Sequence, residues 1–182
     1  MLVVEGMLLR RAGIEGRFGA ELVGRGDLIR PWQTESGTLT LPLSTKWSAT
    51  EPTRLAVLDQ QFAVLLGRYP MLAGRVLSRA VRRARHLAVN MAIVHQARVD
   101  DRLRMLLWLL ASRFGRVRTD GVFVPIRLTH TLLAELVAAR RPTVTSALSS
   151  LAKDGQVRAL DNGWLLLGDP PGELPLHRPS EV

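Results

Sequence analysis

The stretch LTHTLLAELVAARRPTVTSALSSLAKDGQVRALDNGWLLLG, residues 128–168, holds two short helical patterns and then the pattern of a β-hairpin. Thr129 predicts the start of the first helix, because a threonine hydroxyl is a good N-cap acceptor. The second helix is predicted by apolar residues at i, i+3, i+4 and i+7, which are Val144, Ala147, Leu148 and Leu151. The turn 161–163, Asp-Asn-Gly, between two apolar runs predicts the hairpin. Together these elements predict a winged helix-turn-helix.

The second of these helices begins with unusual residues, Arg140, Arg141 and Pro142. Positive charge is poorly placed at a helix N-terminus, whereas proline is well tolerated in the first turn. In a helix-turn-helix, however, the start of the second helix enters the DNA major groove, where arginine binds phosphate or guanine.

Around this start we expect a set of residues that contact DNA through side chains or backbone N–H groups. They are Thr129, His130, Arg140, Arg141, Thr143, Thr145, Ser146 and Ser149. The alternative interpretation of these arginines and hydroxyls is an ordinary solvated helix face.

The composition agrees with a polyanionic partner. The 182 residues contain 25 Lys and Arg against 16 Asp and Glu, which gives a net charge of +9 and favours nucleic acid over an anionic membrane surface. There is no cysteine, which excludes disulfides and thiolate metal sites. The four histidines have no metal-ligand spacing, and no phosphate-binding loop or nucleophile motif is present. We therefore expect no enzyme activity, no catalytic residue and no metal, and no apolar run is long enough to span a bilayer, so we expect a cytoplasmic protein.

Upstream, residues 1–69 form the first of four predicted segments and are mostly β-structure. A strand is expected at 2–11, a turn among the glycines 13–19, an irregular loop or short edge strands at 31–53, and a buried strand at 54–59, followed by a short helix at 60–69. Four or five strands leave the edges of a small barrel or roll uncovered, so this part is expected to be a partial β-roll.

The second segment, residues 70–97, is one long helix with a heptad pattern. Its predicted seam consists of Ala73, Leu77, Ala80, Ala84, Leu87, Met91 and Val94. The other faces carry five arginines and no acid. We expect this helix to form a homodimer; the alternative is that its seam packs on the protein's own β half.

The third segment, 98–168, is the expected DNA-binding domain. It begins with a helix at 98–115, whose first turn holds Asp100 and Asp101, and a turn at Asp120 followed by a short strand leads to the winged helix-turn-helix. The fourth segment, 169–182, is rich in proline and is expected to be a loose tail. The predicted fold class is α+β: a partial β-roll, a long dimerisation helix and a C-terminal winged helix-turn-helix.

The stretch from Leu103 to Leu167 closely resembles the DNA-binding part of the Crp/Fnr (cyclic-AMP receptor protein) transcription regulators of bacteria. Upstream, GAELVGRGDLI is similar to the end of that family's cyclic-nucleotide-binding-type β-roll, EPTRLAVLD to its last strand, and 70–97 to its dimerisation helix. The resemblance implies further strands before Leu2, so the roll is expected to be shortened, either genuinely or through a misplaced start codon.

Nucleotide-binding members of the family carry a Gly-Glu pair for the ribose and an Arg-Ser pair for the cyclic phosphate. This sequence has Arg30-Pro31 and Leu43-Ser44 at those places. The resemblance therefore implies a regulator that does not respond to cyclic AMP, and we expect no cofactor.

In the family's recognition helix, Ser-Arg-Glu-Thr-Val, the resemblance matches Arg141 to the arginine and Thr143 to the threonine. Pro142 replaces the glutamate, and Ser146 stands near the place of the family's second arginine. The resemblance implies a sequence-specific homodimer that binds double-stranded DNA and recruits or blocks RNA polymerase. It also implies that the DNA half-site differs from the family's usual one. The alternatives are a basic dimeric adaptor, an RNA-binding protein, or a shortened regulator that antagonises full-length relatives.

Overall fold

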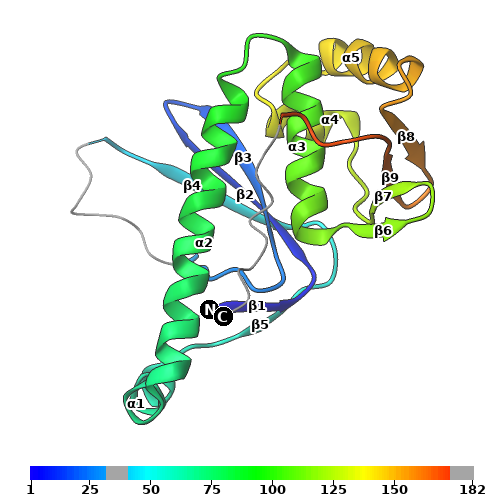
Figure 1. The fold of residues 1–182 in the computed structure, drawn as a ribbon. Coiled ribbons are helices and arrows are strands. Elements are labelled where there is room, and N and C mark those ends of the chain that lie inside the picture. Colours follow the sequence, from blue (N-terminus) through cyan, green and yellow to red (C-terminus); the bar gives the residue numbers. More distant parts are fainter. Residues whose placement is uncertain (32–40, 173–182) are drawn as a thin grey trace. The chain divides into compact units, whose positions relative to one another are not determined.

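A computed structural model describes residues 1–31 and 41–172 (Figure 1). It divides into two units, Met1–Val89 and Asn90–Val182. The proline-rich tail and the loop after Pro31 lie largely outside the described residues.

Two small antiparallel sheets make up the β-structure of the first unit. Strands β2 (Met7–Ile14), β3 (Arg17–Gly24) and β4 (Ser44–Ala49) form one sheet in the order β3-β2-β4. Strands β1 (Leu2–Glu5) and β5 (Arg54–Ala56) form the other. The strand β4 lies at a sheet edge, as the sequence predicted for part of residues 31–53.

The prediction of one continuous strand at 2–11 was wrong, because the chain changes sheet at Gly6. This glycine has φ +85°, and a Cβ atom there would lie 2.2 Å from the carbonyl oxygen of Pro52. Only glycine accepts both conditions without strain.

The buried strand expected at 54–59 was also wrong in length and burial. Only Arg54–Ala56 pairs, and Val57 is 60% exposed. The small core of this unit instead contains Val3, Val23 and Ile29, with Trp47 and Leu55 packed against it.

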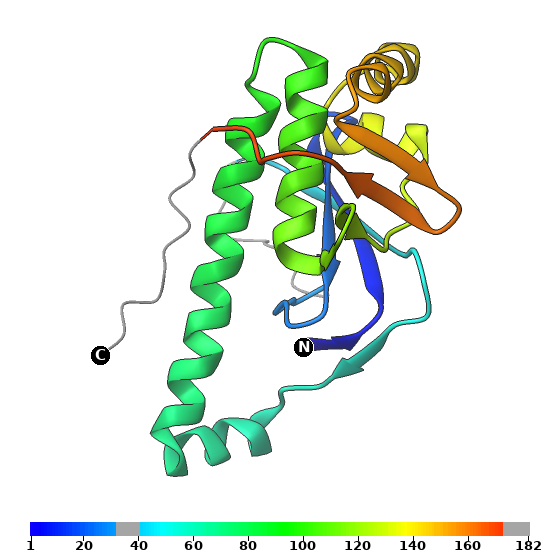
Figure 2. The same cartoon turned by 45° about the vertical axis from the view of Figure 1, so that its right-hand side comes forward.

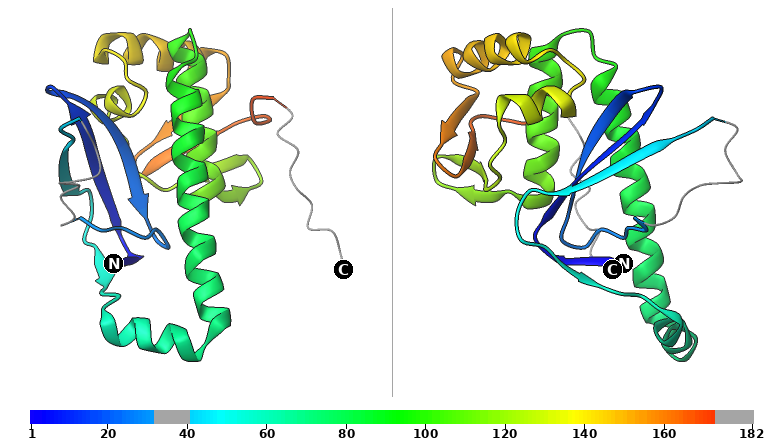
Figure 3. Two further views of the ribbon diagram at one scale, coloured as in Figure 1. Left: turned by 90° about the vertical axis from the view of Figure 1, so that its left-hand side faces the viewer. Right: turned by 180° about the vertical axis from the view of Figure 1, so that it is seen from behind.

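The helices α1 (Gln60–Arg68) and α2 (Pro70–Val94) follow, close to their predicted bounds. The carboxylate of Asp59 accepts the backbone N–H of Phe62 and caps α1. Pro70 then begins the long helix α2, and Figure 3 shows the sharp corner between the two helices. No residue of α1 is buried.

After the end of α2, the second unit contains α3 (Val99–Phe114) and a four-stranded sheet in the order β6-β7-β9-β8. Its strands are β6 (Arg116–Arg118), β7 (Gly121–Val124), β8 (Val157–Leu160) and β9 (Gly163–Leu166). Helices α4 (His130–Leu136) and α5 (Arg141–Lys153) follow β7 and precede β8 along the chain (Figure 2). The sequence predicted all of these elements except β6.

The core of this unit is apolar and well buried. Leu103 and Leu107 of α3 and Leu133 of α4 are fully buried, as is Leu165 of β9. Over the described ranges, no helix combines the length and the hydropathy needed to cross a membrane.

Candidate nucleic-acid interface

Helix α4 begins where the sequence predicted. The hydroxyl of Thr129 accepts the backbone N–H of Leu132 at 3.1 Å and caps the helix. The turn after α4 passes through Ala138, which has φ +51°, and the N–H of Ala139 reaches the carbonyl oxygen of Ala134. This tight turn places α5 directly after α4, as a helix-turn-helix requires.

Helix α5 packs against both α3 and α4 through its apolar side. Val144, Leu148 and Leu151 are buried, and Ala147 is half-buried. Three of the four apolar residues in the predicted stripe therefore reach the core.

The start of α5 is open to solvent. Arg140 is the N-cap residue and makes no side-chain cap, and Pro142 lies in the first turn. With no acid in that turn, the exposed guanidinium groups of Arg140 and Arg141 stand beside N–H groups that the helix leaves unpaired. Such a helix start favours a negatively charged partner.

The predicted DNA-contact residues gather at the start of α4 and along one side of α5. Of these eight residues, seven are exposed and His130 is half-buried. Residues Arg141, Thr145 and Ser149 follow one another at i, i+4 and i+8 in a single row.

The hydroxyl groups of α5 bond within the helix, which the sequence analysis did not predict. Thr145 donates to the carbonyl oxygen of Arg141 at 3.1 Å, and Ser149 donates to that of Thr145 at 3.0 Å. Ser146 donates in the same way to Pro142 at 3.2 Å. The signal was present in the sequence, since Ser and Thr can bond the carbonyl four residues earlier.

A second unpredicted contact joins the two helices. The Nδ1 atom of His130 lies 2.9 Å from the Oγ1 atom of Thr145. These residues are 15 positions apart, so no local spacing indicates the contact.

A shallow hollow of about 380 Å³ lies between the start of α4 and the β8–β9 hairpin. Arg127, Thr129 and His130 line one side, and Asp161 and Gly163 of the hairpin turn line the other. Arg127 was not among the predicted residues, and it adds a positive charge next to Thr129 and His130.

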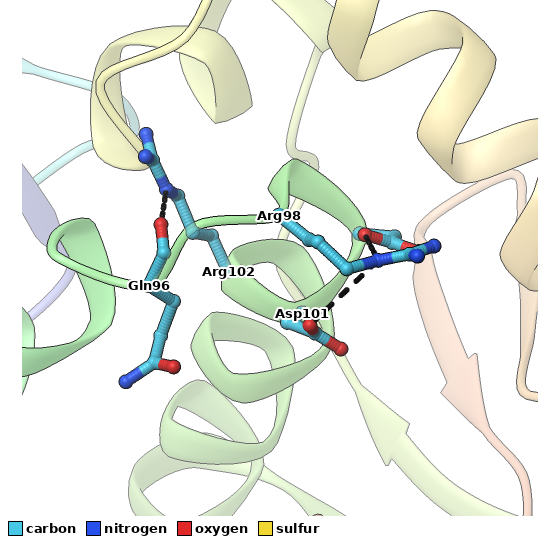
Figure 4. Close-up of polar contacts among 5 residues, drawn as sticks. Gln96, Arg98, Asp101 and Arg102 are labelled. Carbon is cyan, nitrogen blue, oxygen red and sulfur yellow. Dashed lines mark hydrogen bonds and ion pairs between the residues drawn. The ribbon is translucent and has the colours of Figure 1, made fainter.

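A polar cluster holds the junction between α2 and α3 (Figure 4). Arg98 donates from Nε at 3.0 Å and from Nη2 at 2.5 Å to the carboxylate of Asp100. The Nε atom of Arg98 also lies 3.9 Å from the Oδ2 atom of Asp101. The hydrogen bond from Arg98 lowers the pKa of the Asp100 carboxyl from its ordinary value. The Nε atom of Arg102 donates to the carbonyl oxygen of Gln96 at 2.6 Å.

Only part of the predicted seam lies on the exposed side of α2. Leu77, Ala80, Ala84 and Met91 are exposed, whereas Ala73, Leu87 and Val94 are half-buried. A second spacing of 4, 3, 4 and 3 connects only exposed apolar residues. This exposed stripe consists of Leu77, Val81, Ala84, Ala88 and Met91.

The opposite side of α2 is bound to the β-sheet of the first unit. Arg83 donates to the carboxylate of Glu21 at 2.5 Å, and Arg10 of β2 contacts the same oxygen. Arg79 donates to the carbonyl oxygen of Gly26 at 3.1 Å. Glu21, only 8% exposed, thus lies between two guanidinium groups and ties the helix to the sheet.

Arg30-Pro31 and Leu43-Ser44 stand where the resemblance places the two nucleotide-binding pairs of the family. Arg30 is exposed and Pro31 lies in a turn. Leu43 is 41% exposed, and Ser44 begins the edge strand β4. Within residues 1–31 and 41–172, no three His, Asp or Glu side chains gather as a metal site would require.

Comparison with known proteins agrees with this architecture. Residues 101–172 match the model of the Crp-like helix-turn-helix domain. A CRP-like cAMP-activated global transcriptional regulator of Mycobacterium tuberculosis is 36% identical over 95 residues, which are 52% of this chain and 41% of that protein. The match thus spans less than half the length of that relative.

Solved structures cover more of the chain. A CooA mutant from Carboxydothermus hydrogenoformans has a TM-score of 0.68 at 18% identity, and the match covers 92% of this chain and 73% of the CooA chain. A CRP-family transcriptional regulator from Thermus thermophilus has a TM-score of 0.59 at 19% identity, with 92% and 82% covered. At these identities the likeness concerns the fold. Residues 101–172 are thus similar to the Crp-like helix-turn-helix domain, and the chain shares the fold of a β-roll with a C-terminal helix-turn-helix seen in solved CRP-family regulators.

Proposed function

We propose that this chain is a sequence-specific DNA-binding transcription regulator. The observation that carries the proposal is the exposed start of α5, where Arg140 and Arg141 stand beside uncapped N–H groups on the recognition helix of a helix-turn-helix. Arginine can bind phosphate or the O6 and N7 atoms of guanine from such a position. Arg127, and Arg158 of β8, are further exposed cations in the same unit.

In this proposal the active form is a homodimer that forms through the exposed stripe of α2. Leu77, Val81 and Met91 are each more than 60% exposed, a high value for large apolar side chains that repeat with heptad spacing. A symmetric pair presents two recognition helices about one helical turn of DNA apart, to a near-palindromic site. Bound there, the dimer recruits or blocks RNA polymerase.

We further propose that cyclic AMP does not control this protein, although the mycobacterial relative is described as cAMP-activated. Arg30-Pro31 offers no carboxylate at the place where the family binds the ribose, and Leu43-Ser44 offers no guanidinium group at the place where it binds the cyclic phosphate. Isothermal calorimetry with cyclic AMP should give no binding heat. Saturable binding would contradict this part of the proposal.

The main test is selection of bound duplexes from a random DNA pool by the full chain, followed by affinity measurements on the selected site. Wild type should enrich a defined, near-symmetric sequence. Arg140→Ala and Arg141→Ala should each weaken binding at least tenfold. Loss of a phosphate contact should also reduce the dependence of affinity on salt, because neutralised phosphates release counterions. Loss of a base contact should instead relax the sequence preference.

The matched control is Arg68→Ala, which removes an exposed arginine from α1 in the other unit and should leave affinity unchanged. Enrichment of no sequence would contradict the proposal. Equal binding of single-stranded RNA, with equal sensitivity to the arginine substitutions, would favour an RNA-binding protein instead.

A further inference from the structure

The hydroxyl of Thr145 has one hydrogen and two neighbours that can accept it or bond its oxygen. The carbonyl oxygen of Arg141 lies 3.1 Å from Oγ1, and the Nδ1 atom of His130 lies 2.9 Å from it. When Nδ1 carries a hydrogen, His130 donates to Oγ1 and Thr145 donates to Arg141, which satisfies both contacts at once. In the other tautomer the Thr145 hydrogen goes to one of these two acceptors, so in each case it is used within the helix-turn-helix.

Two partners fix the orientation of the Thr145 side chain. Threonine in a helix has two common rotamers, between which its carbonyl bond decides. Here Oγ1 is held by Arg141 within α5 and by His130 from α4. The part of this exposed side chain that remains without a polar partner is its methyl group.

The position of Thr145 is suited to reading bases. It is the fifth residue of α5 and lies one turn beyond Arg141 in the same exposed row. The N-terminal part of a recognition helix lies nearest the base edges in the major groove. With its hydrogen already donated, the Thr145 hydroxyl offers no donor to a phosphate oxygen or to guanine.

Thymine is the base that presents a methyl group in the major groove, and the threonine methyl is a known apolar partner for it. We propose that Thr145 is a specificity-determining residue that contacts a thymine C5-methyl group, and that His130 is the positioning residue that orients it. This inference rests on the proposed DNA binding and adds to it one base preference and the pair of residues that produces it.

The test uses the full chain and the DNA site obtained by selection, with each thymine replaced singly by uracil, which lacks only the methyl group. Wild type should lose about fourfold in affinity at one thymine per half-site, the effect of burying one methyl-sized group. Thr145→Ser keeps the hydroxyl and removes the methyl, so it should bind thymine and uracil sites equally.

The control for Thr145→Ser is Thr119→Ser, which removes the methyl group of an exposed threonine in the turn between β6 and β7, outside the expected DNA contacts. It should keep the wild-type preference for thymine. His130→Ala should reduce the preference at least twofold while its melting temperature stays near that of wild type. His130→Asn keeps an N–H donor at about the same place and should restore the preference, which a merely structural role would not explain.

The outcomes separate the two proposals. If a sequence is selected but wild type binds thymine and uracil equally at every position, or Thr145→Ser keeps the preference, Thr145 is not the reader, while DNA binding stands. If Thr145→Ser loses the preference but His130→Ala keeps it, the positioning role of His130 is wrong. If no duplex is selected at all, both proposals fail.

Discussion

Arg102 of α3 donates from Nε to the carbonyl oxygen of Gln96, at 2.6 Å, just beyond the end of α2. Its Nη1 atom also lies 3.3 Å from the carbonyl oxygen of Val137 and 3.4 Å from that of Ala138, where α4 turns into α5. One guanidinium group therefore joins the segment before α3 to the turn of the helix-turn-helix.

Arg102→Lys should destabilise the second unit by about 1–3 kcal/mol, because an ammonium group cannot reach both sets of carbonyl oxygens at once. Urea unfolding followed by far-UV circular dichroism measures the change. Arg104→Lys is the control on the same helix, since Arg104 makes a single 3.1 Å contact with the carbonyl oxygen of Asp169. It should stay within about 0.5 kcal/mol of wild type, and equal losses in both variants would show that the shared contact has no special weight.

Glu21→Gln should destabilise the first unit by roughly 2–4 kcal/mol, since it leaves the guanidinium groups of Arg10 and Arg83 without their common carboxylate in a largely buried place. Amide hydrogen exchange in β2 and β3 reports this unit separately. Glu5→Gln breaks the exposed pair with Arg54 and should change stability by less than about 1 kcal/mol. A Glu21→Gln protein as stable as wild type would show that the sheet holds α2 without this ion cluster.

Two alanines of α2 distinguish the exposed stripe from the predicted seam. Ala88 belongs only to the stripe and Ala80 only to the seam, and both are exposed. Ala88→Glu should weaken the dimer at least tenfold in analytical ultracentrifugation, because it places carboxylates in the middle of the contact.

Ala80→Glu should leave the dimer intact or strengthen it. In a parallel pair built on the stripe, position 80 would flank the contact, where a carboxylate can meet the exposed arginines of α2. If Ala80→Glu dissociates the dimer and Ala88→Glu does not, the original seam is the contact. A wild-type protein that is monomeric at micromolar concentration would contradict both versions.

The hydrogen bond from Arg98 lowers the pKa of Asp100 in the folded protein. Because the carboxyl pKa is lower in the folded than in the unfolded protein, the ionised carboxylate adds to the free energy of unfolding. This contribution is complete above the unfolded-state pKa, about 3.9, and is lost as the pH falls through the folded-state pKa. The stability difference between wild type and Arg98→Ala should therefore shrink below about pH 4, as measured by urea unfolding across pH. In Arg104→Ala, which loses a contact with a carbonyl oxygen and not with a carboxylate, the difference should not change over this range.

The second unit was largely predictable from sequence because its signals are local. Thr129 as a cap, Pro142 in a first turn and the apolar spacing around Val144 each follow from neighbouring residues. The first unit was harder, since the break at Gly6 depends on the approach of Pro52, which is distant in sequence. Strand β6 was missed because it has only three residues, all of them exposed, including Val117 at 88%, and three residues are too few to establish a period-2 pattern.

The sequence predicted which residues belong to the candidate interface, but it did not predict the hydrogen bonds among them. Exposure of Arg140, Arg141 and the hydroxyl residues follows from the helix period. The pairing of His130 with Thr145 depends on how the turn at Ala138 sets α4 against α5, and no pattern within either helix contains that information. The face of α2 was ambiguous for a similar reason, because small residues occupy two neighbouring heptad stripes and only packing on the sheet separates them.

Because α2 carries several arginines, added salt should have opposite effects on dimer formation and on DNA binding. Arg75, Arg82 and Arg85 are exposed, and the helix carries no acid to compensate them, so two such helices repel each other at low ionic strength. Added salt screens this repulsion and favours pairing, whereas it weakens every contact with phosphate. At protein concentrations near the dimer dissociation constant, occupancy of a DNA site should therefore pass through a maximum at intermediate ionic strength, so that ionic conditions alone could tune the regulator.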